Sequence, residues 1–273
     1  MYNKRMSKEM TAPRRVNLLK SLGRGFKCAY DHLGYVVFVT LASFVLTAMV
    51  LSLTMVVKGK TVPFAATVFV AVLVSWMCAV GAFYYANRAV YYEHPGILDT
   101  LTGIRVLALP ALKLFLIDIL VLAVLVCDAV FFLGLAISNK SLLFAMPGVL
   151  FGYGALIWMM MAMYHLPLLP AQLDMDSGTG PWVIIKKSFL LMAGSPGFTV
   201  GLFLVIIAFA VICALPVLIG TAIIFMGAAA FVLTHALREL FIKYGVVEEE
   251  PEVIDDSWPN VDDKANSEGT TAH

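Results

Sequence analysis

Charged residues are scarce in this chain. Asp, Glu, Lys and Arg make up 14% of its 273 residues, whereas soluble domains carry roughly 25%. Apolar residues make up 61%. A water-soluble fold of this composition would precipitate, because too few charged side chains are present to cover its surface. The composition therefore excludes a soluble globular protein and predicts that long apolar runs lie in lipid.

Cysteines and metal-binding patterns are also sparse. The four cysteines are far apart, with no CxxC pair and no His at metal-ligand spacing, which disfavours disulfides and a zinc site. No HExxH or comparable spacing accompanies His165 or His235. No set of nucleophile, base and oxyanion donor can be assembled, so we expect no catalytic site, no metal and no cofactor, and an intramembrane enzyme is disfavoured. The cysteines are Cys28, Cys78, Cys127 and Cys213.

Six apolar runs are long enough to cross about 30 Å of hydrocarbon at about 1.5 Å per residue. Pro216 separates the last two, which favours a tight hairpin over one kinked helix. The sequence thus predicts an all-α polytopic membrane protein. Its membrane domain covers residues 33–245, between a basic arm at 1–32 and an acidic tail at 246–273 that we expect to be disordered. The predicted spans are 33–57, 63–89, 112–137, 142–169, 198–215 and 217–241.

The basic residues predict the orientation. If the amino terminus is cytoplasmic, sixteen of the nineteen Lys and Arg residues fall on the inner side, leaving Lys58, Lys60 and Lys140 outside. The positive-inside rule then places both termini in the cytoplasm, and we expect a bacterial plasma (inner) membrane location. The expected contacts are the lipid bilayer itself and, at the basic arm, anionic lipids. Nucleic-acid binding is disfavoured because no recognition fold accompanies the arm.

An amphipathic stretch precedes the first, third and fifth spans, at a spacing of roughly 80 residues. This pattern predicts three hairpins, each preceded by a cytoplasmic interfacial helix with its apolar face in lipid. Three unrelated basic flanks remain the alternative. The apolar faces are Leu19, Leu22, Phe26 and Ala29; Ile97, Leu101, Ile104 and Ala108; and Trp182, Ile185 and Phe189. The opposite faces are Lys20, Arg24 and Lys27; Asp99, Thr102 and Arg105; and Lys186, Lys187 and Ser188.

Two acidic residues interrupt the third span, and each costs about 2.5 to 3.5 kcal/mol near a helix centre. Asp118 and Asp128 lie about 15 Å apart along a helix, which excludes a proton-sharing pair. Asp118 either holds helices together through polar contacts or takes part in a proton or substrate relay. Asp128 has no cation at its depth, so we expect it to be protonated or to face a cavity. The residues at a depth similar to that of Asp118 are Arg88, His165, His235 and Arg238.

Two glycine pairs have the GxxxG spacing that lets helices approach closely. They are Gly148 with Gly152 in the fourth span and Gly197 with Gly201 at the start of the fifth. Glycine is common in membrane helices. We interpret both pairs as packing within one chain.

The chain resembles the YesL-like family of bacterial integral membrane proteins, a family with no assigned activity. The resemblance rests on AYDHLGYVVFVTLASF at Ala29–Phe44, FYYANRAVYYEHPGILDTLTGIR at Phe83–Arg105 and HALRELFIKYG at His235–Gly245. It implies a genomic context near carbohydrate uptake systems. We therefore expect an accessory or regulatory protein of solute uptake with a membrane transporter as partner. A small permease or channel with a polar cluster around Asp118 is the alternative.

Overall fold

The computed structural model describes residues 17–55, 61–91, 95–174, 180–215 and 220–247, and these residues contain helices and turns but no β-strand. Six segments are long and apolar enough to cross a membrane, which confirms the predicted all-α polytopic fold. Residues 1–16 of the predicted basic arm and 248–273 of the predicted acidic tail lie outside the described residues. The six segments are Leu33–Met55, Thr61–Val90, Leu98–Asn139, Leu142–Leu173, Pro196–Ala214 and Thr221–Lys243.

Local signals explain where several helices begin. The Asn17 side chain caps α1 by accepting a hydrogen bond from the Leu19 N–H at 3.1 Å. Pro181 and Pro196 occupy the first turns of α7 and α8, where a missing N–H costs no helical bond. The elements are α1 (Leu18–Asp31), α2 (Leu33–Ser52), the 3₁₀ turn η2 (Leu53–Met55), α3 (Thr61–Val90), α4 (Leu98–Asn139), α5 (Leu142–Ala162), α6 (His165–Asp174), α7 (Pro181–Gly194), α8 (Pro196–Ala214), the π turn η3 (Thr221–Phe225) and α9 (Met226–Lys243).

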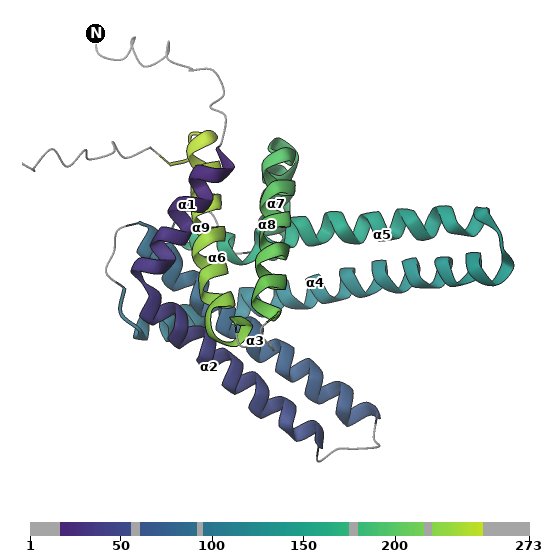
Figure 1. Ribbon diagram of the computed structural model, residues 1–273, viewed down its shortest axis with the longest axis horizontal. Helices are drawn as coiled ribbons and strands as arrows, with labels where there is room; N and C mark the ends of the chain where they lie inside the picture. Colours follow the sequence, from purple (N-terminus) through teal and green to yellow (C-terminus); the bar gives the residue numbers. More distant parts are fainter. Residues whose placement is uncertain (1–16, 56–60, 92–94, 175–179, 216–219, 248–273) are drawn as a thin grey trace, which may run out of the picture.

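Helix α9 lies at the centre of the fold. Twelve of its 18 residues are buried, and it packs against α1, α2, α3 and α6 (Figure 1). Small residues make this possible, since Gly227 and the alanines at 228–230 let neighbouring backbones approach closely. The carboxyl-terminal helix is therefore the packing core, not a peripheral span.

Helices α4 and α5 form a hairpin that projects away from this core (Figure 1). Lys140 adopts a left-handed conformation, with φ of 50°, and closes the turn between them. The rings of Phe132 and Phe151 stack between the two helices, with centroids 5.8 Å apart. Beyond Asp118, the only buried residue of α4 is Ala129. Most of the apolar surface of this hairpin is therefore available to lipid or to another protein.

The predicted boundary between an interfacial helix and the third span is wrong. Residues 98–139 form one continuous helix, with Pro110 inside it. Its first turns pack on α3: a Cβ atom added to Gly103 would lie 2.4 Å from Tyr84, and one added to Gly81 would lie 2.7 Å from Thr100. The fall in hydropathy before residue 112 therefore does not mark the start of the helix, which continues back to Leu98.

Helix α1 departs in part from the predicted lipid-facing arrangement, because Leu22 and Ala29 of its apolar face are buried while Leu19 and Phe26 are exposed. Helix α1 packs along α9, with Gly25 so close that an added Cβ atom would lie 2.9 Å from the Val232 Cα. In α7, Ile184, Ser188 and Leu191 are buried, whereas Trp182 and Phe189 of the predicted apolar face are 76% and 52% exposed. Side-chain periodicity alone did not show that Leu22 and Ala29 of the predicted face are buried in protein, because it cannot distinguish burial in protein from burial in lipid.

Candidate functional site

A break in the fourth spanning segment places His165. Helix α5 ends at Ala162 and α6 begins at His165, with a turn at residues 163–164 between them. Pro167 explains the break, because it cannot donate the hydrogen bond that would continue the helix from the Met163 carbonyl. The change of direction brings the imidazole of His165 between α4 and α7.

His165 links Asp118 of α4 to Ser188 of α7. Its Nδ1 lies 3.0 Å from Asp118 Oδ2, and its Nε2 lies 3.0 Å from Ser188 Oγ. The side chain of His165 is 0% exposed and that of Asp118 is 11% exposed, while Ser188 is 0% exposed. We call these three residues the polar triad. It joins three helices at buried positions of a mainly apolar core.

The hydrogen bonds of the polar triad restrict where its protons lie. The Ser188 hydroxyl has one hydrogen and donates it to the Ile185 carbonyl at 2.9 Å. The His165 Nε2 therefore donates to Ser188 Oγ. The Nδ1 contact then requires either a neutral Asp118 that donates to Nδ1 or a protonated imidazole beside a carboxylate. Both arrangements leave the Asp118–His165 pair without net charge, which lowers the cost of burying it in lipid.

Two polar atoms beside the triad have no hydrogen-bond partner among the described residues. They are Asp118 Oδ1 and Trp158 Nε1, both buried. The Trp158 ring meets the imidazole of His165 edge-on, with centroids 6.0 Å apart. A carboxyl oxygen and an indole N–H are thus held next to the same imidazole, one able to accept and the other to donate a hydrogen bond.

Serine, histidine and aspartate in this order are also the residues of an acyl-transfer triad. That chemistry requires a substrate carbonyl within about 3 Å of the serine oxygen. Ser188 and His165 are both 0% exposed, and the Ser188 hydroxyl already donates to a backbone carbonyl of its own helix. In this conformation the triad can share a proton and hold helices together, but no substrate reaches the oxygen.

Other polar contacts join the helices next to the triad. Tyr164 OH lies 3.0 Å from Thr199 Oγ1, linking the α5–α6 turn to α8. Lys187 donates to Gln172 Oε1, linking α7 to α6. After α9, Tyr244 OH lies 3.1 Å from Ser195 Oγ, at the α7–α8 junction. These hydrogen bonds add a second link between α6 and α7 and tie neighbouring segments to α8 and to the end of α9.

The predicted polar cluster forms only in part. Asp118 and His165 meet, whereas Arg88 forms an ion pair with Asp99 at 3.1 Å. Arg238 donates to the Val90 carbonyl at 3.4 Å, and its guanidinium lies over the Tyr91 ring. The His235 Nε2 is buried and has no partner among the described residues. Of the four residues predicted to lie at the membrane depth of Asp118, His165 contacts it. Arg88, His235 and Arg238 do not.

Ser188 is the site residue that the sequence did not indicate. It lies on the face of α7 that the amphipathic pattern assigns to water, next to Lys186 and Lys187. The orientation of α7 depends on its packing against α5 and α6. The sequence did contain one signal. Ser188 lies four residues after Ile184 and three before Leu191, so this hydroxyl residue shares a helical face with two apolar ones.

Asp128 lies on the projecting part of α4, ten residues beyond Asp118. It is half-buried and has no hydrogen bond or ion pair with any residue that the structure describes. The two intramembrane acids of α4 are thus in different situations. One oxygen of Asp118 has a partner in His165, whereas Asp128 has no partner among the described residues.

One member of each glycine pair lies at a helix contact. An added Cβ atom on Gly148 would lie 2.8 Å from Leu133 of α4, and one on Gly201 would lie 2.7 Å from Leu18 of α1. Gly152 and Gly197 have nothing within 4 Å of that position. The GxxxG spacing thus marks one close approach per pair and leaves the second glycine on an open surface.

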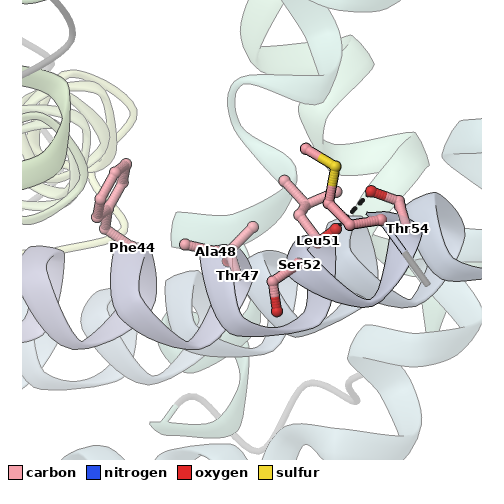
Figure 2. Close-up of a pocket in the computed structure, with 7 residues that line it drawn as sticks. Phe44, Thr47, Ala48, Leu51, Ser52 and Thr54 are labelled. Carbon is pink, nitrogen blue, oxygen red and sulfur yellow. Dashed lines mark hydrogen bonds between the residues drawn. The ribbon is translucent and has the colours of Figure 1, made fainter.

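A shallow hollow lies at the carboxyl-terminal end of α2. None of the residues that line it belongs to the polar triad. Figure 2 shows the side chains that line it, among them Phe44 and Leu51, and its lining is mostly apolar. The hydroxyls of Ser52 and Thr54 donate to carbonyls of their own helix, at 2.7 Å and 2.6 Å. The hollow thus suits an acyl chain better than a polar solute.

The surroundings of Cys28 in α1 predict how the reactivity of its thiol depends on pH. Burial, and then the negative charge of Asp31, raise its pKa from 9.0 to about 11. The thiolate is the reactive form, but its nucleophilicity rises with its pKa, so we expect alkylation near pH 7.5 to be about tenfold slower than for an ordinary thiol. Maleimide labelling of a variant that keeps only Cys28, followed from pH 7 upward, measures this rate.

The rate of Cys28 labelling should continue to rise above pH 9, since half of this thiol is ionised only near pH 11. Asp31→Asn removes the smaller of the two causes and should shift the profile toward lower pH. A profile that levels off near pH 9 in the unmodified chain would contradict the burial of this thiol. Free glutathione, measured in the same buffers, is the reference thiol.

Comparisons with known proteins add no family to this description. No family model, no curated protein and no solved structure matches the chain. Within the described ranges, no group of three or more His, Cys, Asp or Glu residues is placed to hold a metal ion. The site therefore has to be interpreted from its own geometry.

Proposed function

We propose that this chain is an accessory or regulatory protein of a bacterial plasma membrane, with both ends in the cytoplasm, that acts beside a solute-uptake system. Its contribution is to contact a transporter through its membrane helices, without chemistry of its own. The resemblance to the YesL-like family supports a carbohydrate as the solute. The sixteen-to-three distribution of Lys and Arg supports the orientation.

The burial of the polar triad carries this proposal. A permease requires intramembrane polar groups that meet a hydrated path, yet His165 and Ser188 are fully buried and bonded to each other. The His165–Asp118 contact uses one oxygen of the only acid buried in α4. These groups hold helices together, as interhelical hydrogen bonds do in other membrane proteins.

A small permease is the second candidate, and one observation favours it. Asp118 Oδ1 is buried and has no partner among the described residues, so it is able to accept a proton or a ligand if the helices separate. Under this function, Asp118→Asn would abolish flux while the chain remains folded. Under the accessory function, the same change weakens the fold and alters no flux.

Reconstituted vesicles distinguish the two. We expect vesicles that contain the purified chain alone to take up a panel of labelled mono- and disaccharides no faster than protein-free vesicles, with or without a proton gradient. Deleting the gene should nevertheless slow the uptake of at least one of these sugars by whole cells, and the full chain should restore it. Flux above the protein-free level that Asp118→Asn removes would replace the accessory function with the permease.

A further inference from the structure

The outer part of α4 has an uncovered face with one acid in it. Val124 and Phe131, which lie four residues before and three residues after Asp128, are 52% and 60% exposed. These three positions fall on one side of the helix, because i, i+4 and i+7 lie nearly in line. We call Val124, Asp128 and Phe131 the α4 face. It lies on the hairpin that projects from the core (Figure 1).

An unpaired carboxyl group at this depth is costly. Asp128 is roughly 16 Å along the helix axis from Asn139, where α4 ends at the polar turn with Lys140. Its short side chain cannot reach water or a lipid headgroup over that length. An acid near the middle of a span costs about 2.5 to 3.5 kcal/mol unless a partner compensates it. His165 is such a partner for Asp118, whereas no described residue pairs with Asp128.

We propose that the α4 face docks a transmembrane helix of the uptake partner that carries a Lys or Arg at the depth of Asp128. This inference rests on the proposed accessory function and specifies its contact. The exposed Val124 and Phe131 would pack on the apolar surface of that helix, and Asp128 would pair with its cation. Polar pairs of this kind strengthen helix association in lipid because neither group has water as an alternative.

Charge complementarity favours a different chain over a second copy of this one as the occupant. The basic residues nearest to Asp128 along α4 are Lys113 and Lys140, roughly 22 Å and 18 Å away along the axis. Two copies inserted in the same orientation have these lysines at the same depths. Their two Asp128 side chains would meet each other instead, which is unfavourable for like charges. A different sequence can supply at this depth the cation that α4 of a second copy does not.

Synthetic transmembrane peptides test this surface without knowledge of the partner. The full chain, with a donor fluorophore at its carboxyl terminus, is reconstituted with an acceptor-labelled polyleucine helix that has one arginine at its centre. The reference peptide has leucine there. We expect energy transfer to give a Kd about fivefold to thirtyfold lower for the arginine peptide, equivalent to roughly 1 to 2 kcal/mol. Asp128→Asn should remove this preference.

Asp128→Asn is a clean variant because Asp128 has no partner within the described part of the chain, so its unfolding in detergent should match that of the unmodified protein. Equal binding of both peptides overturns the proposal, and so does a preference that survives Asp128→Asn. Transfer between two labelled copies that exceeds transfer to the peptide also overturns it. Solute flux by the chain alone would defeat the accessory function whatever the peptides show. Equal peptide binding without flux defeats only the α4 face.

Discussion

His165→Ala is expected to lower the free energy of unfolding by about 2 to 4 kcal/mol. The change removes both hydrogen bonds of the imidazole, at 3.0 Å to Asp118 and 3.0 Å to Ser188, and leaves a cavity in a fully buried position. It also leaves Asp118 with no partner on either oxygen, because Oδ1 already has none. Unfolding by SDS in mixed micelles, followed by circular dichroism, measures the loss.

Two further variants show how the loss of stability is divided between the two hydrogen bonds of His165. Ser188→Ala removes the hydrogen bond with His165 and the bond to the Ile185 carbonyl, and it leaves the buried His165 Nε2 without an acceptor, so it should cost about 1 to 2 kcal/mol. A double-mutant cycle between Asp118→Ala and His165→Ala isolates the energy of the contact itself. Additive effects of those two changes would mean that the carboxyl and imidazole groups do not interact. A loss for His165→Ala no greater than for Ser188→Ala would contradict the central position of the imidazole.

The sequence was sufficient for the membrane-spanning helices because their cause is local. An uninterrupted apolar run of about twenty residues has few alternatives to a helix in lipid. The predicted limits differ from the observed ones by several residues, and by fourteen at the start of α4, where the helix begins at Leu98. Hydropathy reports where a helix leaves the apolar region, which is not where its backbone stops.

The site was predictable only as far as depth along the helices determines it. Asp118 and His165 could be matched because both interrupt apolar helices at a similar depth. Ser188 could not, since its position depends on how α7 turns against α5 and α6. Arg88 was matched to Asp118 by the same reasoning, but Asp99 lies closer to the start of α4 and pairs with it instead. The depth of a residue in the membrane follows from its position in its own apolar run. The direction in which its side chain points depends on the helices that pack around it.

Which glycines of the core lie at close helix contacts also depends on neighbouring helices. One of them, Gly227, gives the second prediction with a large expected loss of stability. Gly227 of α9 lies against the backbone of α2: an added Cβ atom would lie 2.8 Å from the Val36 Cα and 2.8 Å from the Val36 carbonyl oxygen. Its N–H also donates to Thr40 Oγ1 at 2.9 Å. Two backbones that touch cannot yield as a flexible side chain would. Gly227→Ala should therefore destabilise the protein by about 1 to 3 kcal/mol, measured by unfolding in mixed micelles.

Gly34 is the matched control, because it lies on α2, the helix that Gly227 contacts, and has nothing within 4 Å of an added Cβ atom. Gly34→Ala should be neutral or should stabilise the helix by up to about 1 kcal/mol, since alanine has the higher helix propensity. The two substitutions add the same methyl group, so their difference measures the close approach of α2 and α9 alone. If Gly227→Ala were as harmless as Gly34→Ala, these two helices would be further apart than described, and α9 would not be the packing core.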